Sequence, residues 1–220
     1  MIELVVFDFD GLILDTELPA FRCWQEIYAD HGCELPFETW AACIGTAGGF
    51  DPYGDLAVRS GRAVDQVAVR AREAARFAEL IAGESPLPGV RDYVEAAAGL
   101  GLKLAVASSS SRDWVAGHLD RLGLLGHFDV LKCSDDVVQV KPDPGLYRAV
   151  LDALGVAPHR AIALEDSPNG IAAAKGAGLF CVAVPNALTG RLVLDGADLR
   201  VPSLTELPLA QLLRMAARPA

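Results

Sequence analysis

The stretch LVVFDFDG, residues 4–11, places two aspartates at the end of a run of apolar residues. The run predicts a buried β-strand over Leu4–Phe9, because short apolar segments rich in β-branched and aromatic residues favour strands. Asp8 and Asp10 lie two positions apart where this strand ends, so both carboxylates can face one cleft. Two unpaired carboxylates would repel each other, and one would take up a proton. A hard divalent cation such as Mg²⁺ removes that cost, although two aspartates that cap a turn at Gly11 would show the same spacing.

Similar apolar runs recur along the chain and alternate with segments of helical period. Strands are predicted at residues 103–107, 161–164 and 180–184, with a weaker one at 130–133. Helices are predicted at residues 90–100, 113–122, 144–154 and 168–177. Strands that alternate with single helices indicate right-handed βαβ units. We therefore predict an α/β fold whose core is a doubly wound, Rossmann-like parallel sheet.

One block breaks this alternation. From residue 17 to residue 82 the sequence contains no buried strand, only helical stretches such as 20–30 and 63–81 around a glycine-rich loop at 45–49. Glu17 is interpreted as the cap of the first of these helices. We predict a small all-helical domain at residues 17–83, inserted after the first strand, and an α/β core formed by residues 1–16 and 84–220. The glycine-rich loop is expected to face the cleft of the core.

The composition is typical of a folded protein of one or two domains. The chain has 220 residues, of which 52% are hydrophobic and 22% charged, and this excludes a disordered protein. Its formal charge of −10 argues against nucleic-acid binding, and no apolar run reaches the roughly 20 residues that span a bilayer. The N-terminal residues lack the basic start of a signal peptide, and the five scattered cysteines are typical of reduced thiols. We expect a cytoplasmic monomer that binds neither nucleic acid nor a membrane.

Polar residues follow several predicted strands. Ser108 follows the second, Lys141 lies in the loop beyond the third, and Glu165 and Asp166 follow the next. Because ligands gather at the carboxyl ends of parallel strands, these side chains are expected to meet Asp8 and Asp10 at one edge of the sheet. Other interpretations stay open for single residues. Any serine of 108–111 could cap the helix that follows, and Lys141-Pro142 could be a surface turn.

Four motifs together resemble those of the haloacid dehalogenase superfamily. They are DFDGLILDT at residues 8–16, Ala107-Ser108, VKPDP at 140–144 and EDSPNG at 165–170, in the order of that superfamily. The helical insertion after the first motif looks like the α-helical cap of its β-phosphoglucomutase/phosphatase-like subfamily. The resemblance spans the whole predicted core.

The resemblance implies a role for each residue. Asp8 would be the nucleophile that forms an aspartyl-phosphate, and Asp10 the general acid and base. Ser108, the amide of Ser109 and Lys141 would hold the phosphoryl oxygens. Asp8, the backbone carbonyl of Asp10 and Asp166 would bind Mg²⁺, with Glu165 supporting the metal through a water molecule or from the second shell. The expected enzyme is a Mg²⁺-dependent phosphoric monoester hydrolase.

The sequence also bears on other members of the superfamily. A dehalogenase would not need Asp10, and residues 17–83 lack the cap lysine of a phosphonatase. The alternative function is that of a β-phosphoglucomutase-like sugar phosphomutase, but such mutases carry a histidine where this chain has Ala20, and a cap arginine. Here no arginine occurs between Cys23 and Val58. A phospho-receiver domain would lack the insertion. The substrate is expected to be a small phosphorylated metabolite: a sugar phosphate, a glycolate-type phosphate or a nucleotide.

Overall fold

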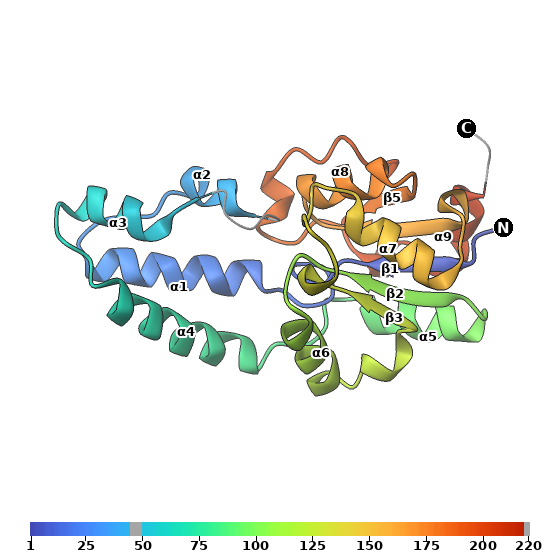
Figure 1. Cartoon of the computed structure of the whole chain (residues 1–220), viewed down its shortest axis with the longest axis horizontal. Helices are drawn as coiled ribbons and strands as arrows, with labels where there is room; N and C mark the ends of the chain where they lie inside the picture. Colours follow the sequence, from blue (N-terminus) through green and yellow to red (C-terminus); the bar gives the residue numbers. More distant parts are fainter. Residues whose placement is uncertain (45–49, 218–220) are drawn as a thin grey trace.

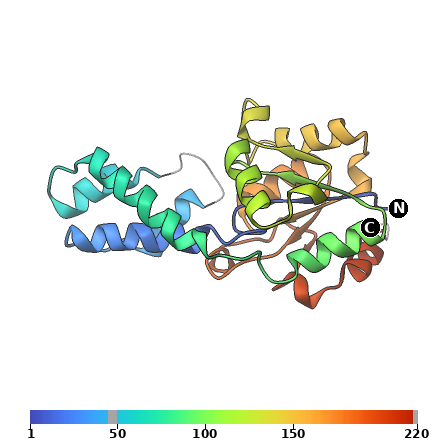
Figure 2. The same cartoon turned by 90° about the horizontal axis from the view of Figure 1, so that it is seen from below.

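The computed structural model describes residues 1–44 and 50–217, and centres on a parallel sheet of six strands in the order β3-β2-β1-β4-β5-β6. The strands are β1 (Leu4–Phe7), β2 (Lys103–Ala107), β3 (Val130–Lys132), β4 (Ala161–Glu165), β5 (Phe180–Ala183) and β6 (Leu199–Arg200). Strand β1 is central, and Phe7 at its end is in register with Val106 of β2 and Leu164 of β4. The sheet lies between two layers of helices (Figures 1 and 2). The predicted α/β fold is confirmed.

The two helical layers bury opposite sides of the same strands. The helices of the core are α5 (Val90–Gly99), α6 (Arg112–Arg121), α7 (Gly145–Leu154), α8 (Pro168–Gly176) and α9 (Leu209–Ala216). Val5 and Phe7 belong to the apolar cluster formed with α5, α6 and α9. Leu4 and Val6 belong to the cluster formed with α7 and α8. Because side chains alternate along a strand, β1 is apolar on both faces, as expected of a buried parallel strand.

The structure differs from the sequence prediction at the ends and in short elements. Strand β1 ends at Phe7 rather than Phe9, because the chain turns at Gly11, whose φ is +84°, and Gly11 donates its amide hydrogen to the carbonyl oxygen of Leu14 at 2.7 Å. Strand β6 contains only two residues, too few for a visible period. Helix α9 was not predicted, although Leu209 and Leu212 are buried at helical spacing.

Among the described residues between β1 and α5, four α-helices form a lobe apart from the sheet (Figures 1 and 2). They are α1 (Glu17–Asp30), α2 (Phe37–Trp40), α3 (Pro52–Ser60) and α4 (Gln66–Ala82). Their own apolar cluster includes Phe21, Trp24, Tyr28 and Leu56. The two connections to the sheet lie side by side, since Leu14 and Pro86 form an antiparallel bridge. The glycine-rich loop predicted to face the cleft, residues 45–49, lies outside the described residues.

Within residues 1–44 and 50–217, no helix combines the length and the apolar character needed to cross a membrane.

Candidate active site

The turn after β1 sets the position of the first two carboxylates. Asp8 donates its amide hydrogen to the carbonyl oxygen of Leu164 at 3.0 Å, which continues the β1–β4 ladder by one residue. A Cβ atom on Gly11 would lie 2.2 Å from the Asp166 carboxylate, so only glycine fits there. The turn therefore brings motif one directly against the residues that follow β4.

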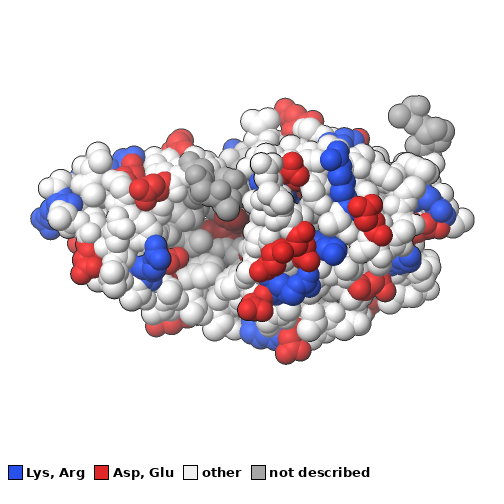
Figure 3. All heavy atoms as spheres, viewed as in Figure 1, with Lys and Arg blue, Asp and Glu red and all other residues white. Residues whose placement is uncertain are grey.

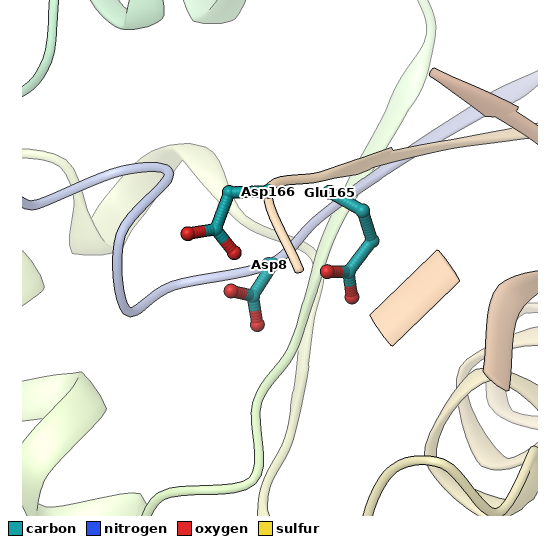
Figure 4. Close-up of side chains that lie close together, drawn as sticks. All are labelled: Asp8, Glu165 and Asp166. Atoms are coloured by element: carbon teal, nitrogen blue, oxygen red, sulfur yellow. The ribbon is translucent and has the colours of Figure 1, made fainter. Parts of the chain in front are cut away.

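Three carboxylates meet at this edge. Asp8, Glu165 and Asp166 can each offer one oxygen such that these atoms lie within 4.8 Å of one another. All three residues are buried. Figure 4 shows their side chains projecting from the ends of β1 and β4, with the carboxylates close together. In the space-filling view, acidic atoms lie at the bottom of the hollow between the two lobes (Figure 3).

Lys141 is the cation of this cluster. Its ammonium group donates to Asp8 Oδ1 at 2.5 Å and to Glu165 Oε1 at 2.6 Å, and the residue is 3% exposed. Burial would lower the pKa of Lys141, but the Asp8 and Glu165 carboxylates raise it above its usual value. A surface turn does not describe Lys141-Pro142, because the lysine side chain reaches into the sheet edge. Tyr147 donates its hydroxyl to the same Glu165 oxygen at 2.5 Å.

The charges of the cluster do not balance. Burial raises the pKa of the Asp8 carboxyl to about 7, with Glu165 and Asp10 adding to the shift and Lys141 opposing it. Burial, Asp8 and Glu165 also raise the pKa of Asp166 well above its usual value. Three carboxylates face one ammonium group, so two negative charges are left over when all are ionised. A buried set of oxygen ligands with this excess fits a hard divalent cation.

Asp10 faces a different set of partners. Its Oδ2 accepts hydrogen bonds from the hydroxyls of Ser108, at 3.3 Å, and Ser110, at 2.7 Å. Its Oδ1 accepts one from the indole nitrogen of Trp114 at 2.9 Å. The Asp10 side chain is thus held toward the loop after β2, and it does not belong to the three-carboxylate cluster.

The four serines after β2, residues 108–111, differ in their hydrogen bonds. Ser111 accepts a hydrogen bond from the amide of Trp114 at 3.4 Å and caps α6. The hydroxyl of Ser109 is buried without a hydrogen-bond partner among the described residues. Ser108 is fully buried, and its hydroxyl oxygen accepts from the amide of Ser110 at 3.0 Å. Helix capping therefore falls to one serine, which leaves 108–110 at the edge that carries Asp8.

Comparisons with known proteins place the chain in a family. The family model described as haloacid dehalogenase-like hydrolase matches residues 5–184. The chain belongs to this family. The "Putative phosphatase YhcW" of Bacillus subtilis is 46% identical over 213 residues, which cover 97% of each protein. The predictions of this superfamily and of an enzyme of the phosphoric monoester hydrolase class are confirmed.

Two solved structures of the family resemble the chain along nearly all its length. A CbbY mutant from Rhodobacter sphaeroides in complex with xylulose-(1,5)bisphosphate is 33% identical, with a TM-score of 0.78, and the match covers 96% of this chain and 99% of that one. A "putative beta-phosphoglucomutase" from Thermotoga maritima is 29% identical, with a TM-score of 0.75 and coverage of 91% and 94%. The fold of the family is therefore shared from end to end.

Sequence reasoning missed several residues of this candidate site. Tyr147 lies on the buried face of α7, and a buried hydroxyl needs a partner, which was a usable signal. Asn186 follows β5 and contacts Asp166, so the rule that selected Ser108 and Glu165 would have selected it too. Trp114 lies in the first turn of α6, and no sequence pattern connects it to Asp10.

Glu17 does not cap the first helix of the insertion. It is the first residue of α1, and Asp15 Oδ1 accepts the hydrogen bond from the amide of Leu18 at 3.1 Å instead. The Glu17 carboxyl is half-buried and close enough to the Asp10 and Asp8 carboxylates to feel their charge. Burial together with these neighbours raises its pKa to about 8. Glu17 therefore places a further acidic group near the candidate site.

Proposed function

We propose that the protein is a Mg²⁺-dependent phosphatase that hydrolyses a small phosphomonoester through an aspartyl-phosphate on Asp8. The observation that carries the proposal is the position of Asp8. Its carboxylate is bound by Lys141 at 2.5 Å and lies in one cluster with Glu165 and Asp166. A nucleophilic carboxylate needs nearby positive charge to accept an anionic phosphoryl group, and this cluster offers a lysine and a place for a cation.

The metal site would be formed by Asp8, Asp166 and the backbone carbonyl of Asp10. Glu165 already accepts hydrogen bonds from Lys141 and Tyr147, so we assign it a supporting position behind the metal or a contact through water. When bound, Mg²⁺ would offset the excess negative charge and let a phosphate dianion approach.

The protein's own residues would carry the two proton transfers. An oxygen of Asp8 attacks phosphorus, and the bond between phosphorus and the ester oxygen breaks. The Asp10 carboxyl gives its proton to the leaving alcohol. Asp10 then takes a proton from water as that water attacks the aspartyl-phosphate, which releases phosphate and restores Asp8. Ser108, the Ser109 amide and Lys141 would hold the phosphoryl oxygens during both steps.

We further propose the domain division 17–83 for the cap and 1–16 with 84–220 for the core. The two adjacent connections support it, because paired linkers allow hinge motion while restricting its direction. Closure of the cap would keep bulk water from the aspartyl-phosphate, and opening would admit the water for hydrolysis.

Hydrolysis is favoured over phosphomutase activity because four of the six arginines in residues 17–83 are engaged within the cap. Arg59 pairs with Asp55, Arg72 with Asp30 and Arg76 with Glu26, all within the cap. Arg70 lies over the ring of Tyr53. A mutase must grip a second phosphate, and these four arginines are held by the cap itself. We propose a phosphorylated sugar or a metabolite of similar size as the substrate, in line with the sugar bisphosphate bound by the CbbY mutant.

The test combines metal removal with one substitution. Hydrolysis of p-nitrophenyl phosphate should stop in EDTA and return with Mg²⁺. Asp8→Asn should abolish turnover, whereas Asp152→Asn, an exposed aspartate of α7 and hence a matched control, should not change it. Wild-type rates in Asp8→Asn would refute the aspartyl-phosphate route. Full activity after exhaustive chelation would refute the metal site.

A further inference from the structure

Asn186 links the candidate metal site to the segment that follows β5. Its side-chain nitrogen donates to Asp166 Oδ2 at 2.9 Å and to the carbonyl oxygen of Gly11 at 2.9 Å. Its side-chain oxygen accepts from the amides of Leu188 and Thr189, both at 2.9 Å. The one side chain therefore joins the end of β4, the turn after β1 and the loop after β5.

The orientation of this amide is fixed by its partners. A side-chain amide has two N–H donors and an oxygen with two lone pairs, and all four are used here. A flipped amide would set its N–H groups against the amide hydrogens of Leu188 and Thr189. It would also set its oxygen against the Gly11 carbonyl and the Asp166 carboxylate. The NH₂ group must therefore face Asp166.

The hydrogen bond matters because Asp166 lies in an unfavourable place for a carboxylate. Asp166 is 2% exposed, and its like-charged neighbours Asp8 and Glu165 repel it. Within the described part of the chain, Asn186 is the residue that donates a hydrogen bond to the Asp166 carboxylate. Gly11 leaves room for this approach, because a Cβ there would lie 2.8 Å from the Asn186 nitrogen.

We propose that Asn186 is a positioning residue that holds the Asp166 carboxylate in the orientation that binds the divalent cation. The proposal rests on the proposed function, which places the cation at Asp166. Hydrogen-bond partners behind a metal ligand fix its orientation, and their loss weakens metal binding by about 10- to 100-fold.

The other half of Asn186 holds a turn that contacts the cap. Leu188 is 3% exposed and belongs to the cap's apolar cluster. The guanidinium of Arg191 lies 3.4 Å from the ring centroid of Phe37 in α2. Thr189 Oγ1 accepts a hydrogen bond from the amide of Asn186 at 3.0 Å, which closes the turn. A test must therefore separate a loosened turn from a misplaced Asp166.

Two variants make this separation. In Asn186→Ser, the hydroxyl oxygen can still accept from the amides of the turn, since serine forms the same turn more weakly, but it is too short to reach Asp166 and Gly11. Thr189→Val is the matched control, because it removes the turn's bond to the Asn186 amide and leaves the Asn186 side chain intact. Asn186→Leu, which removes all four hydrogen bonds at similar volume, is a third variant in case serine weakens the turn too much.

The measurement is direct binding of Mn²⁺ to the full-length protein, with free Mn²⁺ counted by electron paramagnetic resonance and folding checked by circular dichroism. Asn186→Ser and Asn186→Leu are expected to raise the dissociation constant by about 10- to 100-fold. Thr189→Val is expected to leave the constant close to that of the wild type. A dissociation constant that rises equally in Thr189→Val and Asn186→Ser would overturn the positioning role in favour of the turn.

Failure of this proposal can be told from failure of the proposed function. If Asp166→Asn abolishes Mn²⁺ binding while Asn186→Ser binds like the wild type, Asn186 does not position the ligand and the metal site stands. If the wild type binds no Mn²⁺ and keeps its phosphatase activity in EDTA, the metal site itself is wrong.

Discussion

Charged residues are buried at the edge of the sheet and exposed in the cap. At the edge, Asp8, Lys141 and Glu165 are at most 6% exposed, and the Lys141 ammonium group lies within hydrogen-bond distance of both carboxylates. In the cap, Arg76 and its partner Glu26 are 39% and 44% exposed at their side chains. The cap is held together by a buried cluster of aromatic and aliphatic side chains instead.

This difference suggests that the two regions have different tasks. Burying a charge costs several kcal/mol per ion, so an unbalanced buried cluster persists where reaction requires it. Exposed ion pairs contribute about 0–1 kcal/mol and could be exchanged at little cost. We infer that the reactive groups belong to the core, while the cap shapes and closes the space above them. Glu17 links the two regions, since it is the first residue of α1 and interacts electrostatically with Asp8 and Asp10 of the core.

Lys141→Met is expected to have the largest effect, because it should reduce both stability and activity. Removing one partner of a buried ion pair leaves Asp8 and Glu165 uncompensated, and this costs about 3–5 kcal/mol of unfolding free energy. Loss of a group that neutralises transferring charge costs about 10²–10³-fold in kcat. Urea unfolding in EDTA and steady-state hydrolysis measure the two losses.

Mg²⁺ provides the internal control for Lys141→Met. An added cation should restore part of the lost stability, because it offsets the same carboxylates, but it should not restore activity. Lys175→Met, which removes an exposed pair with Asp198, should change the unfolding free energy far less. Equal losses in the two variants would erase the distinction between buried and exposed charges.

Asp10→Asn is expected to lower turnover of alkyl phosphates by about 10²–10⁴-fold with little change in stability. The asparagine can keep hydrogen bonds with the Ser110 hydroxyl and Trp114 but cannot shuttle a proton. The loss should be smaller for p-nitrophenyl phosphate, whose leaving group needs less protonation. Ser110→Ala, which removes one partner of Asp10, should show no such dependence on the leaving group. Equal losses of Asp10→Asn on both ester types would argue against its role as general acid.

The part of the site that follows strands was predictable from the sequence, and the part inside helices was not. Asp8, Glu165 and Asp166 stand out because a charged residue at the end of a buried strand is costly without a partner, and Lys141 lies in the loop beyond β3. Tyr147 and Trp114 lie in helices, where periodicity predicts burial of a face but not the atom that a hydroxyl or indole meets. The same limit applies to the fold. The apolar runs of β1 and β4 were sufficient to predict these strands, whereas the two residues of β6 are too few to show the alternation that predicts a strand.

Glu17→Gln is expected to change how stability depends on pH. The folded pKa of about 8 lies above the ordinary 4.5 of a glutamate, so the folded state holds the proton more tightly. The stability from this group is present at low pH and is lost as the pH rises from about 4.5 to about 8. Glutamine has no such titration, so the decline should be shallower by up to about 1.4 kcal/mol per pH unit.

Urea unfolding in EDTA, at several pH values between 4.5 and 8.5, measures this slope. Glu95→Gln, the same substitution at an exposed position of α5, is the matched control. Asp8 adds a decline of the same sign in both proteins, so the comparison rests on the difference between the variants. Identical slopes in Glu17→Gln and the wild type would mean that the Glu17 carboxyl is not held among the carboxylates of the core.

Arg76→Met is expected to have the smallest effect, and it tests the cap side of the comparison. The guanidinium donates to Glu26 at 2.8 Å and to Glu79 at 3.1 Å, yet all three side chains are well exposed to water. Solvent screens such pairs, so the substitution should change the unfolding free energy only slightly, and less at high salt. A double-mutant cycle of Arg76→Met with Glu26→Gln isolates the pair. Turnover should not change, because the pair lies outside the reacting cluster. A coupling energy well beyond the usual range for exposed pairs would mean that surface charges stabilise the cap as strongly as its aromatic cluster does.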